Sequence, residues 1–239
     1  YISTSSATGF MEGAIRNGVG KRVLSCVNGA FSERWYKIAL ACGKEADSLD
    51  VPWGKAVRGS MIEERLASGK YDAVTVVHSE TSTGVMSPLA EIAASVRKFP
   101  DVFLMVDCVT SMAGTHIPVD ELGLDVALAG TQKAFALPPG LAVAAVSPRV
   151  LERAKTLPAR GVYFDFLEFQ KYHEKNETPN TPAISLIWAL DVQLDEFFKE
   201  GLAKRYARHE SMAKTARSWW SATTTRMGWS RQYRPIARR

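Results

Sequence analysis

The stretch "LDVALAGTQKAFALPPG", residues 124–140, places one lysine just after an apolar run and shortly before two prolines and a glycine. The run "LDVALAG" is typical of a buried strand. Ligands of α/β sheets bind beyond the carboxyl ends of the strands, so Lys133 stands where a site is expected. Most lysines are solvated surface residues and need no such setting. A partly desolvated amine that forms a covalent bond to a carbonyl does need one.

Residues 1–157 alternate apolar runs with helical patterns. Because the runs lack strict polar alternation and are separated by helices, they predict an α/β fold whose mainly parallel sheet is covered by helices on both faces. Residues 158–182 are rich in aromatics and prolines and are predicted to be irregular. Strands are expected over 22–27, 71–80, 101–109, 124–131 and 141–147. Helices are expected over 6–17, 32–43 with Ser32 as N-cap, 60–69, 88–99, 148–157, 183–201 and 202–218.

Length and composition indicate a globular protein without a membrane span. The 239 residues, 46% of them hydrophobic, suffice for one sizeable core. No run is apolar for the length of a membrane span, so we expect no membrane partner. Cys26, Cys42 and Cys108 are widely spaced and form no C-x-x-C motif. We therefore expect three free thiols in a reducing compartment, hence a cytoplasmic protein, and no metal site.

Charge is unevenly distributed along the chain. The net charge is +5, and residues 211–239 hold seven basic and no acidic side chains, which leaves −2 for residues 1–210. Arginines interleaved with Trp219, Trp220, Trp229 and Tyr233 could suit single-stranded nucleic acid. An unpacked terminus is the interpretation that we adopt, so no nucleic-acid partner is expected.

Two further polar segments stand where the sheet would present a site. "SSATG", residues 5–9, opens a helix, and small residues there let backbone N–H groups approach a phosphate. The alternative is an ordinary N-cap by Ser6 or Thr8. "HSETSTG", residues 78–84, follows an apolar strand and could meet a ligand through its hydroxyls. The alternative is that it caps the helix that starts near Pro88.

A buried acid completes the set. Asp107 follows the apolar run "VFLMV" in "VDCVTS", residues 106–111. Burying a carboxylate costs several kcal/mol unless it is paired. The partner is either an arginine or lysine elsewhere, or the protonated ring nitrogen of a cofactor. An anion-binding helix start, a buried acid and a later lysine together indicate pyridoxal 5'-phosphate (PLP), whose ring acts as an electron sink.

The order and wording of these motifs resemble the class V aminotransferases of fold type I, close to alanine–glyoxylate and serine–glyoxylate or serine–pyruvate aminotransferases. The matching segments are "SSATGFMEGAIRN", "VNGAFSERW", "HSETSTGV", residues 106–142 and "TPNTPAISL". They extend from about residue 5 to residue 190, and residues 106–142 are the most specific.

The resemblance implies PLP as cofactor and assigns roles by motif. Lys133 would form the Schiff base with the cofactor, and Asp107 would pair with its ring nitrogen. The "TPNTP" loop would reach the cofactor of a neighbouring copy, which implies a homodimer with shared active sites. The other implied contacts are Ser6, Ala7, Thr8 and Gln132 with the phosphate, Phe31 and Val109 with the two ring faces, Thr81 with the ring oxygen, and Thr181 and Thr178 from the partner's loop.

The implied activity is a ping-pong transamination from alanine or serine to glyoxylate or pyruvate. We expect a PLP-binding large domain over residues 1–190, connecting helices over 191–220 and an atypical basic tail over 221–239. We also expect the N-terminal segment to be absent, and the C-terminal small domain, which would carry the substrate-carboxylate arginine, to be largely missing.

Other classes of enzyme share parts of this pattern. Phosphoserine aminotransferase, another class V enzyme, or a truncated PLP-binding module with little activity remain alternatives. Cysteine desulfurases are disfavoured, because Gln132 rather than histidine precedes Lys133 and no cysteine follows Cys108. A nucleotide-binding enzyme is disfavoured because the chain has neither a G-x-G-x-x-G nor a P-loop motif.

Overall fold

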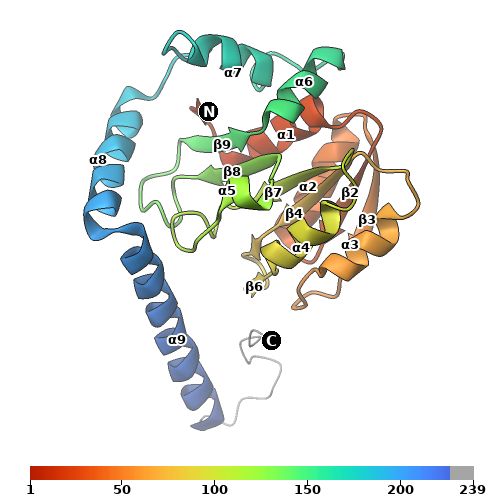
Figure 1. Ribbon diagram of the computed structural model, residues 1–239. Coiled ribbons are helices and arrows are strands. Elements are labelled where there is room, and N and C mark those ends of the chain that lie inside the picture. The colour runs from red at the N-terminus through yellow and green to blue at the C-terminus, as the bar shows by residue number, and fades with distance from the viewer. Residues whose placement is uncertain (227–239) are drawn as a thin grey trace.

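The computed structural model describes residues 1–226 and is built around one seven-stranded sheet (Figure 1). Five neighbouring strands, β3, β2, β4, β7 and β8, run parallel, while β9 is antiparallel to both β8 and β1. The prediction of a mainly parallel sheet is therefore confirmed. In sheet order the strands are β1 (Ile2–Ser3), β9 (Ala142–Val146), β8 (Val126–Gly130), β7 (Phe103–Asp107), β4 (Ala73–Val77), β2 (Arg22–Val27) and β3 (Glu45–Asp50).

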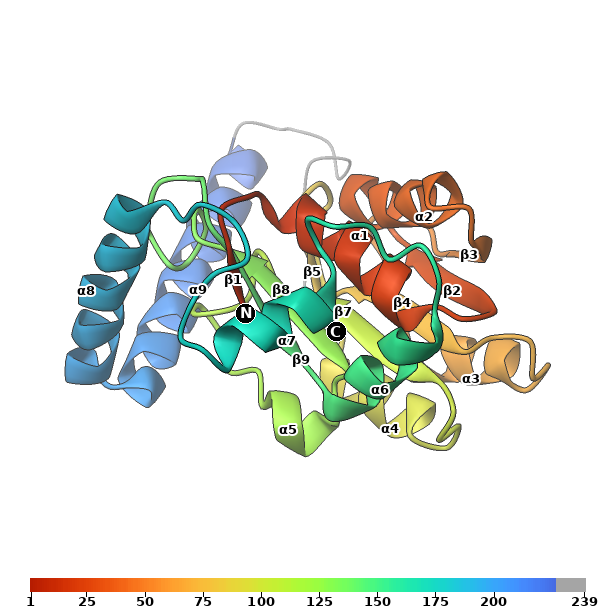
Figure 2. The ribbon, with the colours of Figure 1, turned by 90° about the horizontal axis from the view of Figure 1, so that it is seen from above.

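Helices cover both faces of the sheet (Figure 2). One face carries α1 (Ala7–Gly18), α2 (Ala30–Ala41), α6 (Pro148–Thr156) and α7 (Phe166–His173); the other carries α3 (Gly59–Leu66), α4 (Leu89–Val96) and α5 (Val119–Leu122). Successive residues of β7 alternate between the two cores, since Met105 packs on the first face and Leu104 on the second. Every residue of β4 and β7 is buried, which explains why these strands show no polar alternation.

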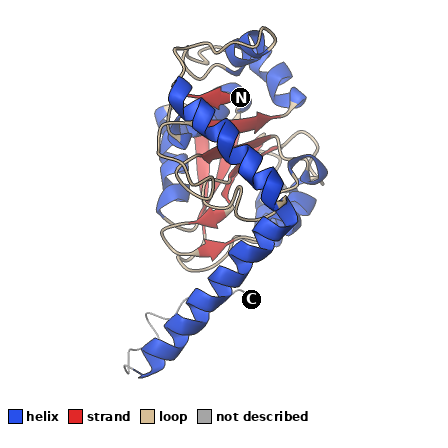
Figure 3. Ribbon diagram, turned by 90° about the vertical axis from the view of Figure 1, so that its left-hand side faces the viewer, coloured by secondary structure: helices blue, strands red, loops and turns tan. Residues whose placement is uncertain are grey.

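Two long helices, α8 (Ile184–Glu200) and α9 (Leu202–Arg226), lie beside the end of the sheet that β9 and β1 form (Figures 1 and 3). Leu190 and Phe197 of α8 pack on Phe135 and Leu141 in a separate small core. Gly201 separates the two helices with a φ of +83°, a conformation that favours glycine. No helix in the described part of the chain is long and apolar enough to cross a membrane.

Several elements differ from the predictions. β3 was missed because "EADSLD" is polar, and it is an edge strand with no fully buried residue. The short strands β1 and β6 (Val85–Met86) and the single turn α5 were also missed. The strand predicted over 71–80 is divided into β4 and β5 (Ser79–Glu80), and β5 pairs with β6 in a hairpin. The segment 158–182, predicted to be irregular, contains α7, which Asp165 caps and which buries Phe166 and Phe169.

The ends of two helices also differ from the predictions. The helix α2 begins at Ala30, so the prediction of Ser32 as its N-cap was wrong. The last helix runs to Arg226 rather than to about Ser218. The domain boundary predicted at residue 190 falls within α8, and the division into domains stays a prediction. Most of the predicted basic tail, residues 227–239, lies outside the described residues.

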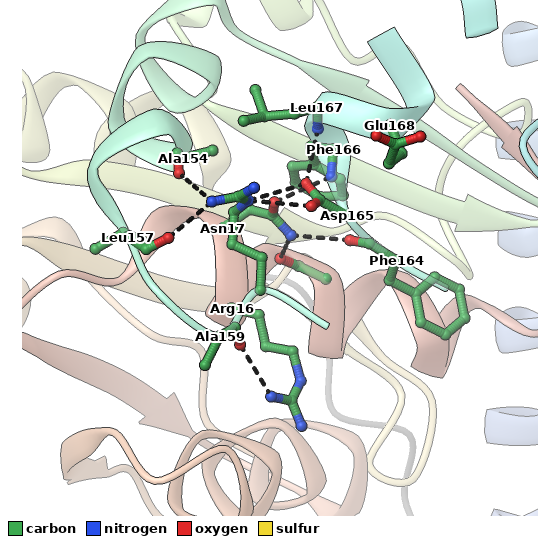
Figure 4. A network of polar contacts seen from close by, with 12 residues as sticks. Arg16, Asn17, Ala154, Leu157, Ala159, Phe164, Asp165, Phe166, Leu167 and Glu168 are labelled. Carbon is green, nitrogen blue, oxygen red and sulfur yellow. Dashed lines mark hydrogen bonds and ion pairs between the residues drawn. The ribbon is translucent and has the colours of Figure 1, made fainter. Parts of the chain in front are cut away.

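A buried asparagine ties α1 to the segment before α7 (Figure 4). Asn17 is fully buried; its amide nitrogen donates to the carbonyl oxygens of Gly13 and Phe164, each at 2.8 Å. Its side-chain oxygen accepts from the backbone N–H of Phe166 at 3.0 Å. Because Asn17 satisfies three backbone groups at once, it fixes how the C-terminal end of α1 lies against the segment before α7.

We expect Asn17→Ala to lower the free energy of unfolding by about 2–4 kcal/mol, because it leaves buried backbone groups without partners and opens a small cavity. Urea titration measures this change. Asn180→Ala is the matched control, since the Asn180 side chain has no hydrogen bond among the described residues. Equal effects of the two substitutions would contradict the role assigned to Asn17.

Candidate active site

Loops from four parallel strands meet at the carboxyl edge of the sheet. The backbone N–H of His78, just after β4, donates to the carbonyl oxygen of Asp107 at the end of β7. The N–H of Cys108 donates to Leu128 in β8 in the same way. β1 also ends at this edge, because it is antiparallel to β9, which is itself antiparallel to β8. The residues that follow β1, β2, β4, β7 and β8 therefore surround one region.

Asp107 lies at the centre of this region and is 4% exposed. Its Oδ1 accepts a hydrogen bond from the backbone N–H of Val109 at 2.7 Å. Among residues 1–226 it makes no ion pair with an arginine or lysine, so the alternative of an ordinary ion pair is not met. Burial raises the pKa of Asp107 to about 7; the Val109 hydrogen bond opposes this, Glu80 adds to it, and Lys133 opposes it.

This raised pKa makes stability depend on pH. Asp107 in the folded protein holds its proton more tightly than in the unfolded chain, where its ordinary pKa is 3.8. The resulting stabilisation is complete below about pH 4 and is lost as the pH rises through 7. In the cofactor-free chain, the stability of Asp107→Asn relative to wild type should therefore increase by about 2–4 kcal/mol between pH 4 and pH 8.

Urea titrations of wild type and Asp107→Asn at several pH values test this prediction. Asp101→Asn is the control, because it removes the same carboxylate charge from an exposed position. A difference between Asp107→Asn and wild type that does not change with pH would show that burial leaves this carboxyl unperturbed.

Lys133 lies in a tight loop after β8. The fully buried Thr131 closes the loop: its Oγ1 donates to the carbonyl oxygen of Pro138 at 3.0 Å, and its carbonyl accepts from the N–H of Leu137. Ala136 has a φ of +58°, which a residue other than glycine rarely adopts. The loop leaves Lys133 and Gln132 exposed at the site, and the charge of Lys133 acts on Asp107. The structure thus brings the predicted lysine and acid together.

The beginning of α1 contributes backbone N–H groups. Ser6 occupies the N-cap position, but no side chain caps the helix in the described structure, so the predicted alternative of a plain cap by Ser6 or Thr8 is not met. The Ser5 Oγ is buried and has no hydrogen-bond partner within residues 1–226. Unsatisfied donors at a helix N-terminus favour an anion.

The "HSETSTG" loop contacts the loop that follows β7. Thr81 and Thr110 share a hydrogen bond of 2.6 Å between their hydroxyls, and the His78 Nδ1 lies 2.9 Å from the Ser111 Oγ. The alternative that this loop caps α4 is not met, because Pro88 holds the N-cap position and no side chain there makes a cap hydrogen bond. Thr81 is therefore held at the site, close to the Asp107 loop.

Glu80 is a residue that the sequence reasoning missed. It is fully buried, and its carboxylate accepts from the backbone N–H groups of Phe31 and Ser32 and from the hydroxyls of Ser32 and Ser82. Burial alone would raise the pKa of Glu80, but these hydrogen bonds outweigh burial and lower it. Glu80 thus caps α2 and holds Phe31 beside the Thr81 loop. Its position within a hydroxyl-rich segment was the only signal in the sequence.

The close approach of Glu80 requires Gly29. A Cβ atom at Gly29 would lie 2.4 Å from the Glu80 Cγ and 2.5 Å from the Ser82 Oγ. Gly29 itself has an extended backbone, so the constraint is the space that Glu80 occupies and not the backbone conformation.

The remaining predicted residues divide into two groups. Phe31 and Val109 are half-buried and pack against the core on the α1 side, near the site. Thr178 and Thr181 are not brought to Lys133 within the chain. The Thr178 Oγ1 donates to the Asn180 carbonyl, and the segment around it lies beside β1, while Thr181 is exposed. Their contact with a partner's cofactor stays a prediction.

The mainly parallel sheet, with Lys133 and the buried Asp107 at its carboxyl edge, matches the fold type I domain of solved aminotransferases. Residues 10–223 match the family described as aminotransferase class-V. The chain belongs to the class V aminotransferase family, as the resemblance indicated.

The relatives agree with this assignment. An uncharacterized aminotransferase of Methanocaldococcus jannaschii is 41% identical over 91% of the chain and 58% of its own length. Serine–glyoxylate aminotransferase of Arabidopsis thaliana is 32% identical over 91% and 56%, respectively. The solved alanine–glyoxylate aminotransferase of Nostoc sp. has a TM-score of 0.84 at 30% identity, covering 90% of this chain and 58% of that one.

A phosphoserine aminotransferase also matches. The solved protein from Cytophaga hutchinsonii has a TM-score of 0.78 at 28% identity over 86% of this chain and 57% of its own. The chain thus spans less than three fifths of the length of these relatives.

Proposed function

We propose that the chain is the PLP-binding part of an aminotransferase that moves an amino group from alanine or serine to glyoxylate or pyruvate by a ping-pong mechanism. The observation that carries the proposal is that Lys133 acts on the buried Asp107, which has no ion pair among residues 1–226, at the sheet edge where α1 begins without a side-chain cap from those residues. The donor and acceptor classes follow the printed names of the serine–glyoxylate and alanine–glyoxylate relatives.

The residues present fit PLP. The N-terminus of α1 and the Ser5 Oγ suit a phosphate, because in the described part of the chain neither has a side-chain hydrogen-bond partner. Asp107 lacks a cation within the described chain, and a protonated ring nitrogen would supply one. The cofactor would be held by Ser6, Ala7, Thr8 and Gln132 at the phosphate, Phe31 and Val109 at the ring faces, Thr81 at the ring oxygen, Asp107 and Lys133, with Thr178 and Thr181 from a partner copy.

When bound, PLP supplies an electron sink for the substrate α-carbon. The Asp107 carboxylate would keep a proton on the ring nitrogen, since a paired cation favours the ionised form of a buried acid. The Lys133 Nζ would hold the cofactor and, once released, would accept a proton from the substrate α-carbon and return it to the C4′ carbon of the cofactor. The Glu80 carboxylate would keep Phe31 and Thr81 in place around the ring.

A homodimer with shared active sites is part of this proposal. The side chains of Ile184, Trp188 and Val192, at i, i+4 spacing on α8, are 67%, 70% and 52% exposed. Such a stripe is typical of an interface. It directly follows the exposed Thr181, which would reach the partner's cofactor. Sedimentation of the chain with and without PLP measures the state of assembly.

Three free cysteines support a reducing, cytoplasmic setting.

An amino-donor panel tests the proposed reaction. The purified chain is loaded with PLP and mixed with glyoxylate or pyruvate and one of alanine, serine, aspartate and phosphoserine, and the product amino acid is measured. Turnover with alanine or serine supports the proposal. Turnover with phosphoserine alone would favour the phosphoserine aminotransferase alternative. Cofactor binding without turnover of any donor would favour a PLP-binding module.

A further inference from the structure

A buried arginine of α9 links the two loops that carry Lys133 and Asp107. Arg205 is 5% exposed. Its Nε donates to the carbonyl oxygen of Ala113 at 2.8 Å, and its Nη2 donates to the carbonyl oxygen of Ala134. Ala134 directly follows Lys133, and Ala113 belongs to the loop that leaves β7 after Asp107. One guanidinium therefore bridges the two loops.

The rest of the guanidinium is fixed by α8. Its Nη1 lies 3.3 Å from the Glu200 carboxylate, and its Cζ lies 3.6 Å from the centre of the Phe197 ring. Phe197 also packs against Phe135, two residues after Lys133. With an acid, a ring and two carbonyls as partners, the planar guanidinium has one orientation, which a lysine ammonium could not reproduce.

The two loops touch where Arg205 holds them. A Cβ atom at Gly114 would lie 3.1 Å from the Ala134 Cβ and 3.7 Å from the Nδ1 of His209 on the next turn of α9. Ala113 has a φ of +66°, a conformation that its surroundings must impose. The carbonyl of Ala113 is the one that Arg205 binds, so the strained residue is held by the same side chain.

We propose that Arg205 is a positioning residue, which holds the Lys133 loop and the Asp107 loop at the separation that the reaction requires. This inference rests on the proposed function for the roles of Lys133 and Asp107. In this role Arg205 contacts neither the cofactor nor the substrate. It acts by binding the backbone carbonyls of Ala113 and Ala134, one in each loop.

The first test uses the cofactor-free chain. In Arg205→Lys, backbone hydrogen exchange at Ala136, Leu137, Gly114 and Thr115, whose N–H groups are bonded within the two loops, should be at least about tenfold faster. Exchange in β2 should not change. Arg208→Lys is the matched control, because Arg208 binds the same Glu200 carboxylate but neither loop. Loop exchange equal to that of the control, or equal acceleration in β2, would overturn the proposal.

The second test uses the PLP-loaded chain. Arg205→Lys should lower kcat about 10- to 100-fold with KM nearly unchanged, because small displacements of reacting groups cost this much. It should also shift the pH midpoint of the visible cofactor band, and Arg205→Gln should behave similarly. If the wild-type chain attaches no PLP at Lys133, the proposed function is contradicted but the role of Arg205 in holding the two loops is not. That role is decided by the hydrogen-exchange comparison of Arg205→Lys with Arg208→Lys.

Discussion

Lys133→Ala is expected to lower transaminase turnover by at least about 10³-fold, because it removes both the attachment of the cofactor and the base that moves the substrate proton. The visible absorption band of PLP bound to the wild-type chain should be absent from the variant. Borohydride reduction of the wild-type complex should fix the cofactor on the peptide that contains Lys133, which mass spectrometry of the digest would show.

Lys70→Ala is the control for this substitution, because Lys70 is exposed and lies at the amino edge of β4, away from the site. It should retain the turnover, the absorption band and the labelled peptide. Stability measured by urea titration should be similar for the two variants, since Lys133 makes no side-chain hydrogen bond in the described structure. A labelled peptide without Lys133, or full turnover in Lys133→Ala, would refute the assignment.

Asp107→Asn is expected to lower turnover about 10²- to 10³-fold, the range seen when one preorganised electrostatic partner of a developing charge is removed. The asparagine still accepts the Val109 hydrogen bond but cannot keep a proton on the cofactor ring. In the cofactor-free chain, the stability of the same variant relative to wild type should increase as the pH rises from about 4 to about 8. The substitution should therefore lower turnover while it removes a pH-dependent cost to stability, as expected where a buried acid serves function.

The control for this second substitution keeps the charge. Asp107→Glu should bind PLP and retain more turnover than Asp107→Asn, although its longer side chain displaces the ring. Single-turnover kinetics with alanine measure the first half-reaction separately from product release. Wild-type rates in Asp107→Asn would show that the carboxylate is not needed, and the buried acid would then lack a functional explanation.

Periodicity and composition predicted much of the frame. The apolar runs that became β2, β4, β7 and β8 are buried on both faces, as their lack of polar alternation predicts, whereas β9 is only partly buried. The polar edge strand β3 could not be recognised in this way, because its stability comes from pairing along the whole of β2. α7 was missed because its aromatic residues do not show a helical pattern. The helix is stabilised by the Asp165 cap and by the packing of Phe166 and Phe169 against α1.

The sequence by itself predicted which residues would carry the proposed chemistry. Asp107 ends one recognisable strand and Lys133 follows another, while residues 5–9 open a recognisable helix. The topology of a parallel sheet places such strand ends at one edge. Only the tertiary structure decided how these residues are held. Glu80 caps α2 at Ser32, 48 positions away in the sequence, and Arg205 binds the carbonyls of Ala113 and Ala134, which are 92 and 71 positions away. These side chains form hydrogen bonds with backbone N–H and C=O groups. Almost every residue carries such groups, so no sequence pattern predicts which ones a distant side chain will contact.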